Sequence, residues 1–274
     1  MLATDRELDI GDEPTVFEFV ERNRPTAILN CAAYTAVDAA ETDEATATRV
    51  NGVGPRNLAR AAVFAQAHLV HVSTDYVFPG DGTVPYVETD PIGPRNAYGR
   101  SKLAGDLAIA EAFERSQERG SSRWIVFRTS WLFGDGGSSF VETMWRLMGD
   151  KAELKVVNDQ VGRPTYVEDL AAVMILASGI GQVAAPPSGV WHFANAGQTS
   201  WHGFATAIRE SMLRAGVAVR TERVLPVSSE EFPRPAPRPR YSVLDTKKLE
   251  SWGVQPRPWR EALDEYIDAR ALRL

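Results

Sequence analysis

The sequence has little of several features that define large classes of protein. It contains one cysteine, Cys31, which excludes an intrachain disulfide and a multi-cysteine zinc site. No run of about 18 apolar residues is present to form a membrane-spanning helix, and the residues after Met1 do not resemble a signal peptide. The net charge of −6 does not favour general nucleic-acid binding, because phosphate contacts need a basic surface. We therefore expect a cytoplasmic protein that binds neither nucleic acid nor a membrane.

Common catalytic and cofactor motifs are also scarce. The four histidines, His68, His71, His192 and His202, show no spacing typical of a zinc site, and no Gly-x-Ser-x-Gly elbow indicates a serine hydrolase. The glycine-rich turn that normally holds a dinucleotide pyrophosphate is missing. Residues 52–55 (GVGP) do not replace it, because a proline follows the glycines and no strand precedes them.

What is present is the composition and rhythm of an α/β protein. The chain has 274 residues, 44% hydrophobic and 24% charged, as is ordinary for a globular protein. Apolar runs of strand length at 26–31, 69–73 and 124–128 alternate with helical patterns at 38–67, interrupted at 51–55, and from Tyr98 to about Ala112. This alternation predicts βαβ units and a Rossmann-like, doubly wound parallel sheet.

The second half has a less regular pattern. We predict a dinucleotide-binding domain over residues 1–150, incomplete at its N-terminus and rejoined by a helix at 166–179, and a smaller, irregular substrate-binding lobe over 180–274. Residues 158–165 are predicted to form a polar loop. The proline- and arginine-rich stretch 233–240 fits either an extended polyproline spacer, which we favour, or a segment that brings Arg238 or Arg240 to a phosphate.

Tyr98 and Lys102 are spaced to share one face of a helix. A phenol has a pKa of about 10, and a nearby ammonium group lowers it towards the range useful for acid–base catalysis. The pair therefore fits proton transfer to or from a substrate oxygen during hydride transfer. The alternative is an exposed helical pair without catalytic function.

Other candidates lie where predicted strands end, since ligands bind at the carboxyl ends of parallel strands. Thr74 is a candidate for holding a substrate carbonyl, with Ser73 as the competing choice because side chains alternate along a strand. Asp75 could bond a substrate hydroxyl or cap a turn. Tyr34 and Trp131 could line a sugar or base, or be core aromatics.

Five ordered blocks resemble the dTDP-4-dehydrorhamnose reductase family, a branch of the extended short-chain dehydrogenases/reductases. The blocks are residues 30–38 (NCAAYTAVD), 73–78 (STDYVF), 98–105 (YGRSKLAG), 128–133 (RTSWLF) and 158–165 (NDQVGRPT). The most specific of them is 73–78, and the resemblance covers nearly the whole chain.

The resemblance implies NAD(P)H-dependent reduction of the 4-keto group of dTDP-4-dehydro-β-L-rhamnose. Tyr98 would donate the proton, Lys102 would lower its pKa and bind the nicotinamide ribose, and Thr74 would bond the sugar carbonyl. The remaining implied contacts are Asp75 and Trp131 with the substrate, and Asp9, Ile10, Ala32, Ala33, Tyr34 and Thr35 with the cofactor. Family members can hold Mg²⁺ at a dimer interface, but the sequence does not support a ligand set; Glu168 and Asp169 are more simply carboxylates at a helix start. A homodimer is expected on the same basis.

The first residues of this sequence resemble a part of the family's pattern that follows its first strand, glycine turn and first helix. Residues 1–10 resemble the end of its second strand, and the first strand, glycine turn and first helix are not in this sequence. We therefore expect a longer active protein, weak dinucleotide affinity in this chain and an unpaired strand in its sheet. The alternative function is a non-catalytic, nucleotide-binding regulatory protein of the same fold, like the regulatory subunit of methionine adenosyltransferase. A nucleotide-sugar epimerase or dehydratase is a weaker third hypothesis.

Overall fold

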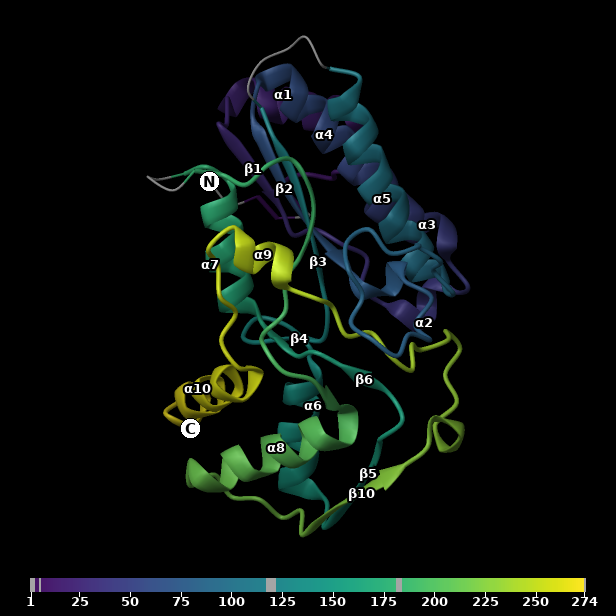
Figure 1. Ribbon diagram of the computed structural model, residues 1–274, viewed down its shortest axis with the longest axis vertical. Helices are drawn as coiled ribbons and strands as arrows, with labels where there is room; N and C mark the ends of the chain where they lie inside the picture. Colours follow the sequence, from purple (N-terminus) through teal and green to yellow (C-terminus); the bar gives the residue numbers. More distant parts are fainter. Residues whose placement is uncertain (1–2, 5, 117–121, 181–183, 274) are drawn as a thin grey trace.

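The computed structural model describes residues 3–4, 6–116, 122–180 and 184–273. Two lobes lie one above the other in Figure 1. The upper lobe contains a parallel sheet with helices packed against it, and the lower lobe contains α6, α8 and α10 with the short strands β5 and β10. No helix in the described part of the chain is long and apolar enough to cross a membrane.

The central sheet confirms the predicted α/β class. Its strands are β1 (Ala27–Asn30), β2 (His68–Thr74), β3 (Trp124–Thr129) and β8 (Gly189–His192), in the order β1-β2-β3-β8 and all parallel. The register places Asn30 beside His71 and Thr74 beside Thr129. Within the described residues β1 pairs only with β2, so it forms an edge of the sheet.

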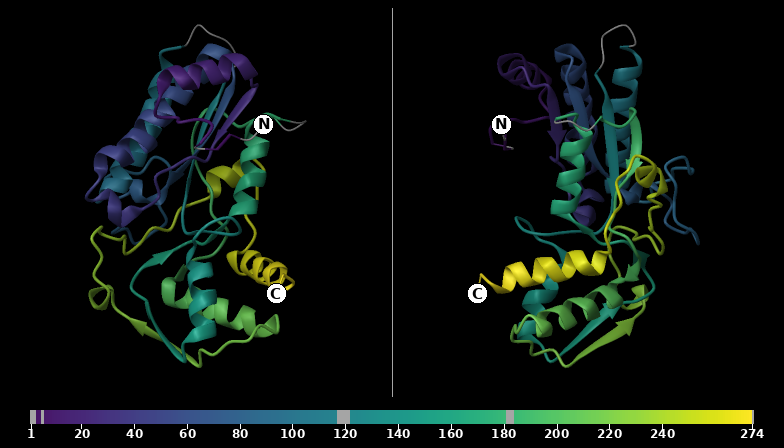
Figure 2. Two further views of the ribbon diagram at one scale, coloured as in Figure 1. Left: turned by 180° about the vertical axis from the view of Figure 1, so that it is seen from behind. Right: turned by 60° about the vertical axis from the view of Figure 1, so that its left-hand side comes forward.

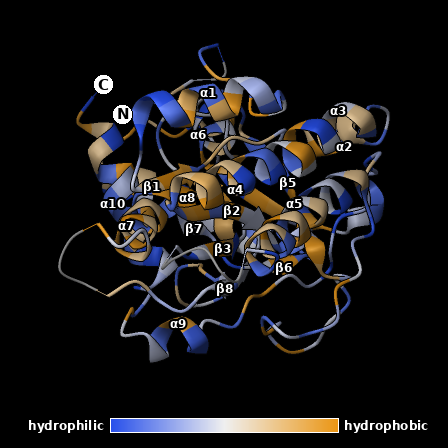
Figure 3. Ribbon diagram, turned by 90° about the horizontal axis from the view of Figure 1, so that it is seen from above, coloured by the Kyte–Doolittle hydropathy of each residue, from blue (hydrophilic) through white to orange (hydrophobic). Residues whose placement is uncertain are grey.

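Helices cover both faces of this sheet, as a doubly wound fold requires. α1 (Glu13–Asn23), α4 (Gly54–Ala65) and α5 (Ala97–Glu114) pack on one face, against Leu69 and Val126. α7 (Val167–Ala177) and α9 (Lys247–Ser251) pack on the other, against Val70 and Ile125. Neighbouring strand residues thus point to opposite faces, and the layers can be followed in Figure 2. Figure 3 shows hydrophobic residues concentrated along the strands between the helices.

The predicted interruption at 51–55 is helical in the structure. After α2 (Val37–Ala40), α3 (Glu44–Thr48) continues through a π-helical turn at Arg49–Val53 directly into α4. Glycine is common where helices break, but in this region a glycine of the neighbouring helix α5 permits close packing against the π-helical turn. A Cβ atom on Gly105 of α5 would lie 2.2 Å from the Asn51 carbonyl oxygen. The turn also directs the Asn51 side chain inward, where it is fully buried.

The lower lobe is built on apolar packing between α6 (Phe140–Asp150), α8 (Trp201–Arg214) and α10 (Trp259–Ala271). β5 (Glu153–Val157) pairs in parallel with β10 (Arg223–Val227), a strand the sequence analysis did not predict. The prediction of a loop at 158–165 is partly wrong, because it contains β6 (Val161–Gly162) and the start of β7 (Thr165–Tyr166). These two-residue strands pair with β9 (Thr199–Ser200) and β4 (Leu132–Phe133), partners that a local sequence pattern does not indicate.

The packing does not follow the predicted domain boundary at residue 150. α6 belongs to the core of the lower lobe, although it was assigned to residues 1–150. β8 and α9 belong to the sheet, although they lie within 180–274. The α7 helix packs on the sheet.

Candidate active site

The start of α5 places Tyr98 beside the end of β2. Asn96 caps the helix by accepting a hydrogen bond from the Gly99 backbone N–H at 2.8 Å. A Cβ atom on Gly99 would lie 2.4 Å from the Tyr76 carbonyl oxygen, so only glycine allows the helix to lie this close to the turn after β2. This turn, a 3₁₀ segment at Asp75–Val77, begins directly after Thr74.

The predicted proton donor is protonated at neutral pH. Burial raises the pKa of Tyr98 to about 12; the Thr74 hydroxyl, which faces the phenol, lowers it, while the charges of Asp75 and Asp106 add to the increase. Of the two candidates at the strand end, Thr74 is therefore the one whose hydroxyl influences the phenol of Tyr98. The Ser73 hydroxyl instead faces the Asp106 carboxyl group.

The single proton of the Thr74 hydroxyl is committed to Asp75 in this structure. Thr74 Oγ1 accepts a hydrogen bond from the Tyr76 N–H at 3.2 Å and donates to Asp75 Oδ1 at 3.0 Å. Asp75 is 3% exposed, and burial raises the pKa of its carboxyl group to about 6. Thr74 can thus donate to a carbonyl oxygen only when Asp75 releases this bond or becomes protonated.

Lys102 lies one turn after Tyr98 but its ammonium nitrogen bonds elsewhere. Nζ lies 2.6 Å from the Val72 carbonyl oxygen and 3.2 Å from Nε2 of His71. The side chain is 1% exposed, and burial lowers the pKa of Lys102 to about 8. Burial is the largest influence on the pKa of both Tyr98 and Lys102, and Nζ of Lys102 contacts Val72 and His71.

The residues after β1 form an open edge at the carboxyl end of the sheet. Asn51 fixes Tyr34 from both sides: its Oδ1 accepts from the Tyr34 N–H at 2.8 Å and its Nδ2 donates to the Tyr34 carbonyl at 2.9 Å. Nδ2 also contacts Ser101 of α5 at 3.0 Å. Ala32 and Thr35 are exposed, and Ala33 is partly so. Small side chains and an ordered, accessible backbone fit the close approach of a nucleotide.

Asn51 is a site residue that the sequence analysis missed. The available signal was a polar side chain within an alanine-rich helical stretch, which needs a hydrogen-bonding partner when it is buried. His71 and Asn30, the residues behind Lys102, were missed for the same reason. His71 was noted only as a buried histidine in a strand.

The two predicted adenine-side residues are held by the π-helical turn and α4. Arg49 pairs with Asp9 at 2.9 Å, and Asn57 donates to the Ile10 carbonyl at 3.0 Å. They lie in the turn before α1, apart from the Tyr98–Thr74 contact. Asp9 and Ile10 thus fit the adenine side of a dinucleotide and the open edge after β1 fits the rest of the nucleotide, whereas the sequence offers no glycine turn for the pyrophosphate.

Trp131 follows β3 in a left-handed backbone conformation, with φ of 48°. Its indole stacks on that of Trp201, with ring centroids 3.5 Å apart and planes 8° from parallel. Gly162 lies against it, since a Cβ atom there would be 2.5 Å from the ring. The half-buried indole thus bridges the sheet lobe and the aromatic core of the lower lobe.

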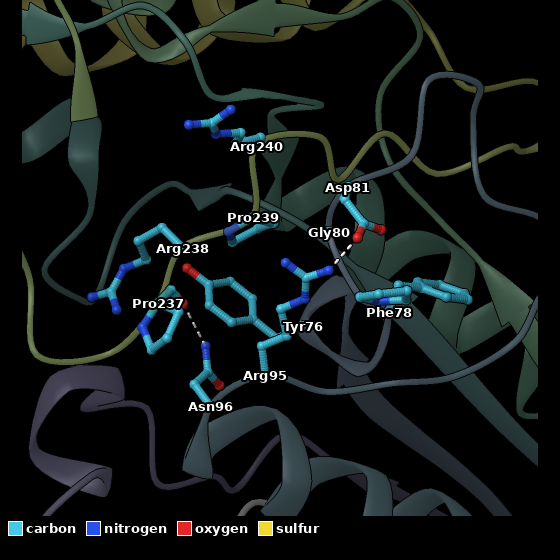
Figure 4. Close-up of a pocket in the computed structure, with 11 residues that line it drawn as sticks. Tyr76, Phe78, Gly80, Asp81, Arg95, Asn96, Pro237, Arg238, Pro239 and Arg240 are labelled. Atoms are coloured by element: carbon cyan, nitrogen blue, oxygen red, sulfur yellow. Dashed lines mark hydrogen bonds and ion pairs between the residues drawn. The ribbon is translucent and has the colours of Figure 1, made fainter. Parts of the chain in front are cut away.

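The proline-rich stretch lies beside Tyr76 and Asn96 and lines a pocket with them (Figure 4). Asn96 donates to the Pro237 carbonyl at 2.9 Å, and Asp38 accepts from the Ala236 N–H at 3.2 Å and pairs with Arg238 at 2.9 Å. Arg238 therefore faces a carboxylate in this structure. The stretch connects the lower lobe to the N-terminal cap of the Tyr98 helix.

The carboxylates considered for Mg²⁺ lie in the first turn of α7. Asp169 accepts hydrogen bonds from Asn195 at 2.7 Å and from Arg257 at 2.9 Å, which commits it to a structural role. Among the described residues no group of three or more His, Cys, Asp or Glu side chains could hold a metal ion.

Comparisons with known proteins agree with this geometry. The family described as RmlD substrate binding domain matches residues 1–272. The dTDP-4-dehydrorhamnose reductase of Burkholderia thailandensis is 43% identical over 269 residues, which cover 96% of this chain and 87% of the relative. The chain belongs to the dTDP-4-dehydrorhamnose reductase family.

Solved structures of the family superpose closely. The Clostridium acetobutylicum dTDP-4-dehydrorhamnose reductase gives a TM-score of 0.88 at 38% identity, covering 100% of this chain and 90% of that one. The Bacillus anthracis dTDP-4-dehydrorhamnose reductase, solved in complex with NADP, gives 0.85 at 38% identity, covering 96% and 88%. Family membership and the Rossmann-like fold are thereby confirmed.

Proposed function

We propose that this chain reduces the 4-keto group of dTDP-4-dehydro-β-L-rhamnose with NAD(P)H and releases dTDP-L-rhamnose. The observation that carries the proposal is the meeting of Tyr98, Thr74 and the buried Lys102 at the carboxyl end of β2, in a chain of the reductase family. A regulatory protein without catalysis would not need a protonated phenol beside a buried threonine hydroxyl.

The chain's own residues have distinct roles in this reaction. Tyr98, protonated at neutral pH, donates its proton to the carbonyl oxygen as that oxygen gains negative charge. Thr74 orients the carbonyl when its proton is released from Asp75. Lys102, Ala32, Ala33, Tyr34 and Thr35 would hold the nucleotide of NAD(P)H, with Asp9 and Ile10 on the adenine side, and the nicotinamide bound there would supply the hydride.

Trp131 is the proposed contact for the sugar ring. Its stack on Trp201 fixes the indole and leaves part of the side chain accessible. Aromatic faces pack well against the apolar side of a pyranose. We also propose that the sheet lobe binds the cofactor and the lower lobe binds the substrate. A cytoplasmic location and a homodimer are part of the same proposal. Native mass spectrometry would test the homodimer.

The test is to follow NADPH or NADH absorbance in the presence of dTDP-4-dehydrorhamnose. We expect wild-type turnover and a loss of roughly 10²- to 10⁴-fold in kcat for Tyr98→Phe, because only the donated proton is removed. Tyr76→Phe is the matched control, since its ring packs edge-on to Tyr98 with centroids 5.6 Å apart and should retain most activity. Equal turnover in Tyr98→Phe and wild type would exclude Tyr98 as the donor. Binding of the nucleotide sugar without any turnover would favour the regulatory alternative.

A further inference from the structure

A series of buried hydrogen bonds links the residues after β1 to Lys102 through Asn30 and His71. The Ala32 N–H donates to Asn30 Oδ1 at 3.1 Å, Asn30 Nδ2 lies 2.9 Å from His71 Nδ1, and His71 Nε2 lies 3.2 Å from Lys102 Nζ. The three side chains are almost inaccessible to solvent: His71 is 0% exposed, Lys102 1% and Asn30 4%. No role in the proposed function has been given to Asn30 or His71.

The chemistry of each group determines which partner donates and which accepts in these hydrogen bonds. A backbone N–H can only donate, so the atom of Asn30 that faces Ala32 is the carbonyl oxygen. The amide NH₂ of Asn30 then faces His71 and can also only donate, so Nδ1 of His71 must accept. Burial, with the charge of Lys102, keeps the pKa of His71 well below its usual range, so the imidazole is neutral. Its one proton is therefore on Nε2.

This tautomer presents an N–H donor to Lys102. An ammonium group has donors and no acceptor, so a charged Lys102 would face the Nε2–H of His71 without a bond. A neutral amine has a lone pair that accepts from Nε2–H while one of its own protons is donated to the Val72 carbonyl. The lowered pKa of Lys102, caused first by burial, agrees with this arrangement.

The other titratable groups near Lys102 act in the opposite direction. Asp106, one turn further along α5, and the Cys31 thiol after β1 both favour the charged form. The influence of Asp106 is shared with Arg128 of β3, which pairs with it at 3.2 Å. Tyr98, one turn earlier on α5, is protonated and neutral at neutral pH. His71 is thus the group beside Lys102 that favours the amine.

We propose that Asn30 and His71 are positioning residues: Asn30 dictates the Nε2–H tautomer of His71, and His71 thereby sets the pH at which Lys102 loses its charge. The inference uses the proposed function only to make Lys102 relevant to the reaction; the tautomer itself follows from contacts within the chain. Its consequence is that the charge of the site changes with pH close to neutrality.

Asn30→Asp tests the proposal with almost no change of shape. A carboxylate still accepts from the Ala32 N–H, but its second oxygen needs a donor and so draws the imidazole proton to Nδ1. Nε2 then presents a lone pair that accepts from the Lys102 ammonium. We expect ¹⁵N spectra of histidine-labelled protein to show His71 protonated on Nε2 in wild type and on Nδ1 in Asn30→Asp, with His71→Leu used for assignment. In lysine-labelled protein, Lys102 should titrate about one pH unit or more higher in the variant.

Cys31→Asp separates the tautomer from the added charge. It places a carboxylate on the neighbouring residue, where a negative charge also favours charged Lys102, and leaves the hydrogen bond from Asn30 to His71 in place. We expect it to raise the titration of Lys102 and leave His71 protonated on Nε2. Nδ1 protonation in the wild-type spectrum, or an unchanged tautomer in folded Asn30→Asp, would overturn the proposal. The wild-type spectrum alone shows which nitrogen of His71 is protonated, even when the variant does not fold. None of these readouts involves substrate, so absence of turnover would count against the proposed function alone.

Discussion

The polar region behind the site is buried, whereas most residues of the aromatic cluster of the lower lobe are partly buried, and the two regions are held together differently. The polar region consists of Asn30, His71, Lys102, Asp106 and Arg128, in which each group has one or two directed partners. The aromatic cluster consists of Trp131, Phe140, Trp201, Phe204 and Trp259, whose rings pack with centroids 3.5–6.5 Å apart. Directed bonds fail when one atom is removed, whereas aromatic packing weakens gradually. The polar region should therefore determine how stability and activity depend on pH, and the aromatic cluster should determine the shape of the lower lobe around Trp131.

The largest expected effect comes from the ion pair of the polar region. Arg128 and Asp106 side chains are 5% and 2% exposed and lie 3.2 Å apart. Arg128→Leu leaves a buried carboxylate without its partner, which should reduce the free energy of unfolding by about 3–5 kcal/mol. Denaturant titration measures the change.

The double variant Arg128→Leu/Asp106→Leu is the control for that prediction. It removes both charges and should recover most of the lost stability, since two apolar side chains replace a desolvated pair. A double variant as unstable as Arg128→Leu would mean that shape rather than charge matters here, which would weaken the contrast with the aromatic cluster.

Gly99→Ala should have the next largest effect. The added Cβ atom would lie 2.4 Å from a backbone oxygen of Tyr76, which cannot move aside as a side chain can. We expect a loss of about 2–4 kcal/mol, because the start of α5 must shift away from β2. Gly149→Ala is the matched control in α6 of the lower lobe, where nothing lies within 4 Å of the added atom. It should stabilise the protein by up to about 1 kcal/mol through helix propensity.

The same contrast explains what could be predicted from the sequence. The strands, the long helices, Tyr98 with Lys102 and the site at the carboxyl ends of the strands follow from local periodicity and spacing, and the structure places Tyr98 and Thr74 together. Periodicity reports which face of an element is apolar. It does not report which polar group a buried side chain will bond, and so the sequence analysis missed Asn30 and Asn51.

Long-range pairing was the other part that local patterns could not supply. The loop predicted at 158–165 contains β6 and the first residue of β7, strands that are each two residues long and are defined only by their partner strands. The partners of Lys102 could not be predicted for a related reason: helical spacing brings two side chains to one face, but the contacts of Nζ with the Val72 carbonyl and with His71 Nε2 determine where that nitrogen lies.

Asp75→Asn should have a smaller effect that depends on pH. The pKa of Asp75 is raised from 3.8 to about 6 by burial, so the folded state binds its proton more tightly than the unfolded state does. This carboxyl group therefore destabilises the fold increasingly as pH rises from about 4 to about 6, by up to about 3 kcal/mol. The variant should match wild type below pH 4 and exceed its stability at pH 7, measured as Tm across that range. Parallel curves for the two proteins would show that Asp75 is not titrated in this window.

The smallest expected change lies in the aromatic cluster. Trp201→Leu removes the ring on which Trp131 stacks and should cost about 1–2 kcal/mol of stability, less than a fully buried aromatic, because Trp201 is partly exposed. Trp131 then loses its fixed orientation, and KM for the nucleotide sugar should rise about twofold to tenfold, as expected for one aromatic pair. The pH profile of kcat should not move, since no titratable group is altered. Trp145→Leu, a residue of the same lobe that lies under Arg270 with the guanidinium 4.6 Å from the ring centroid, should leave KM unchanged. If Trp201→Leu shifted the pH profile instead of KM, the two regions would be coupled, and Trp131 would belong to the proton chemistry rather than to sugar binding.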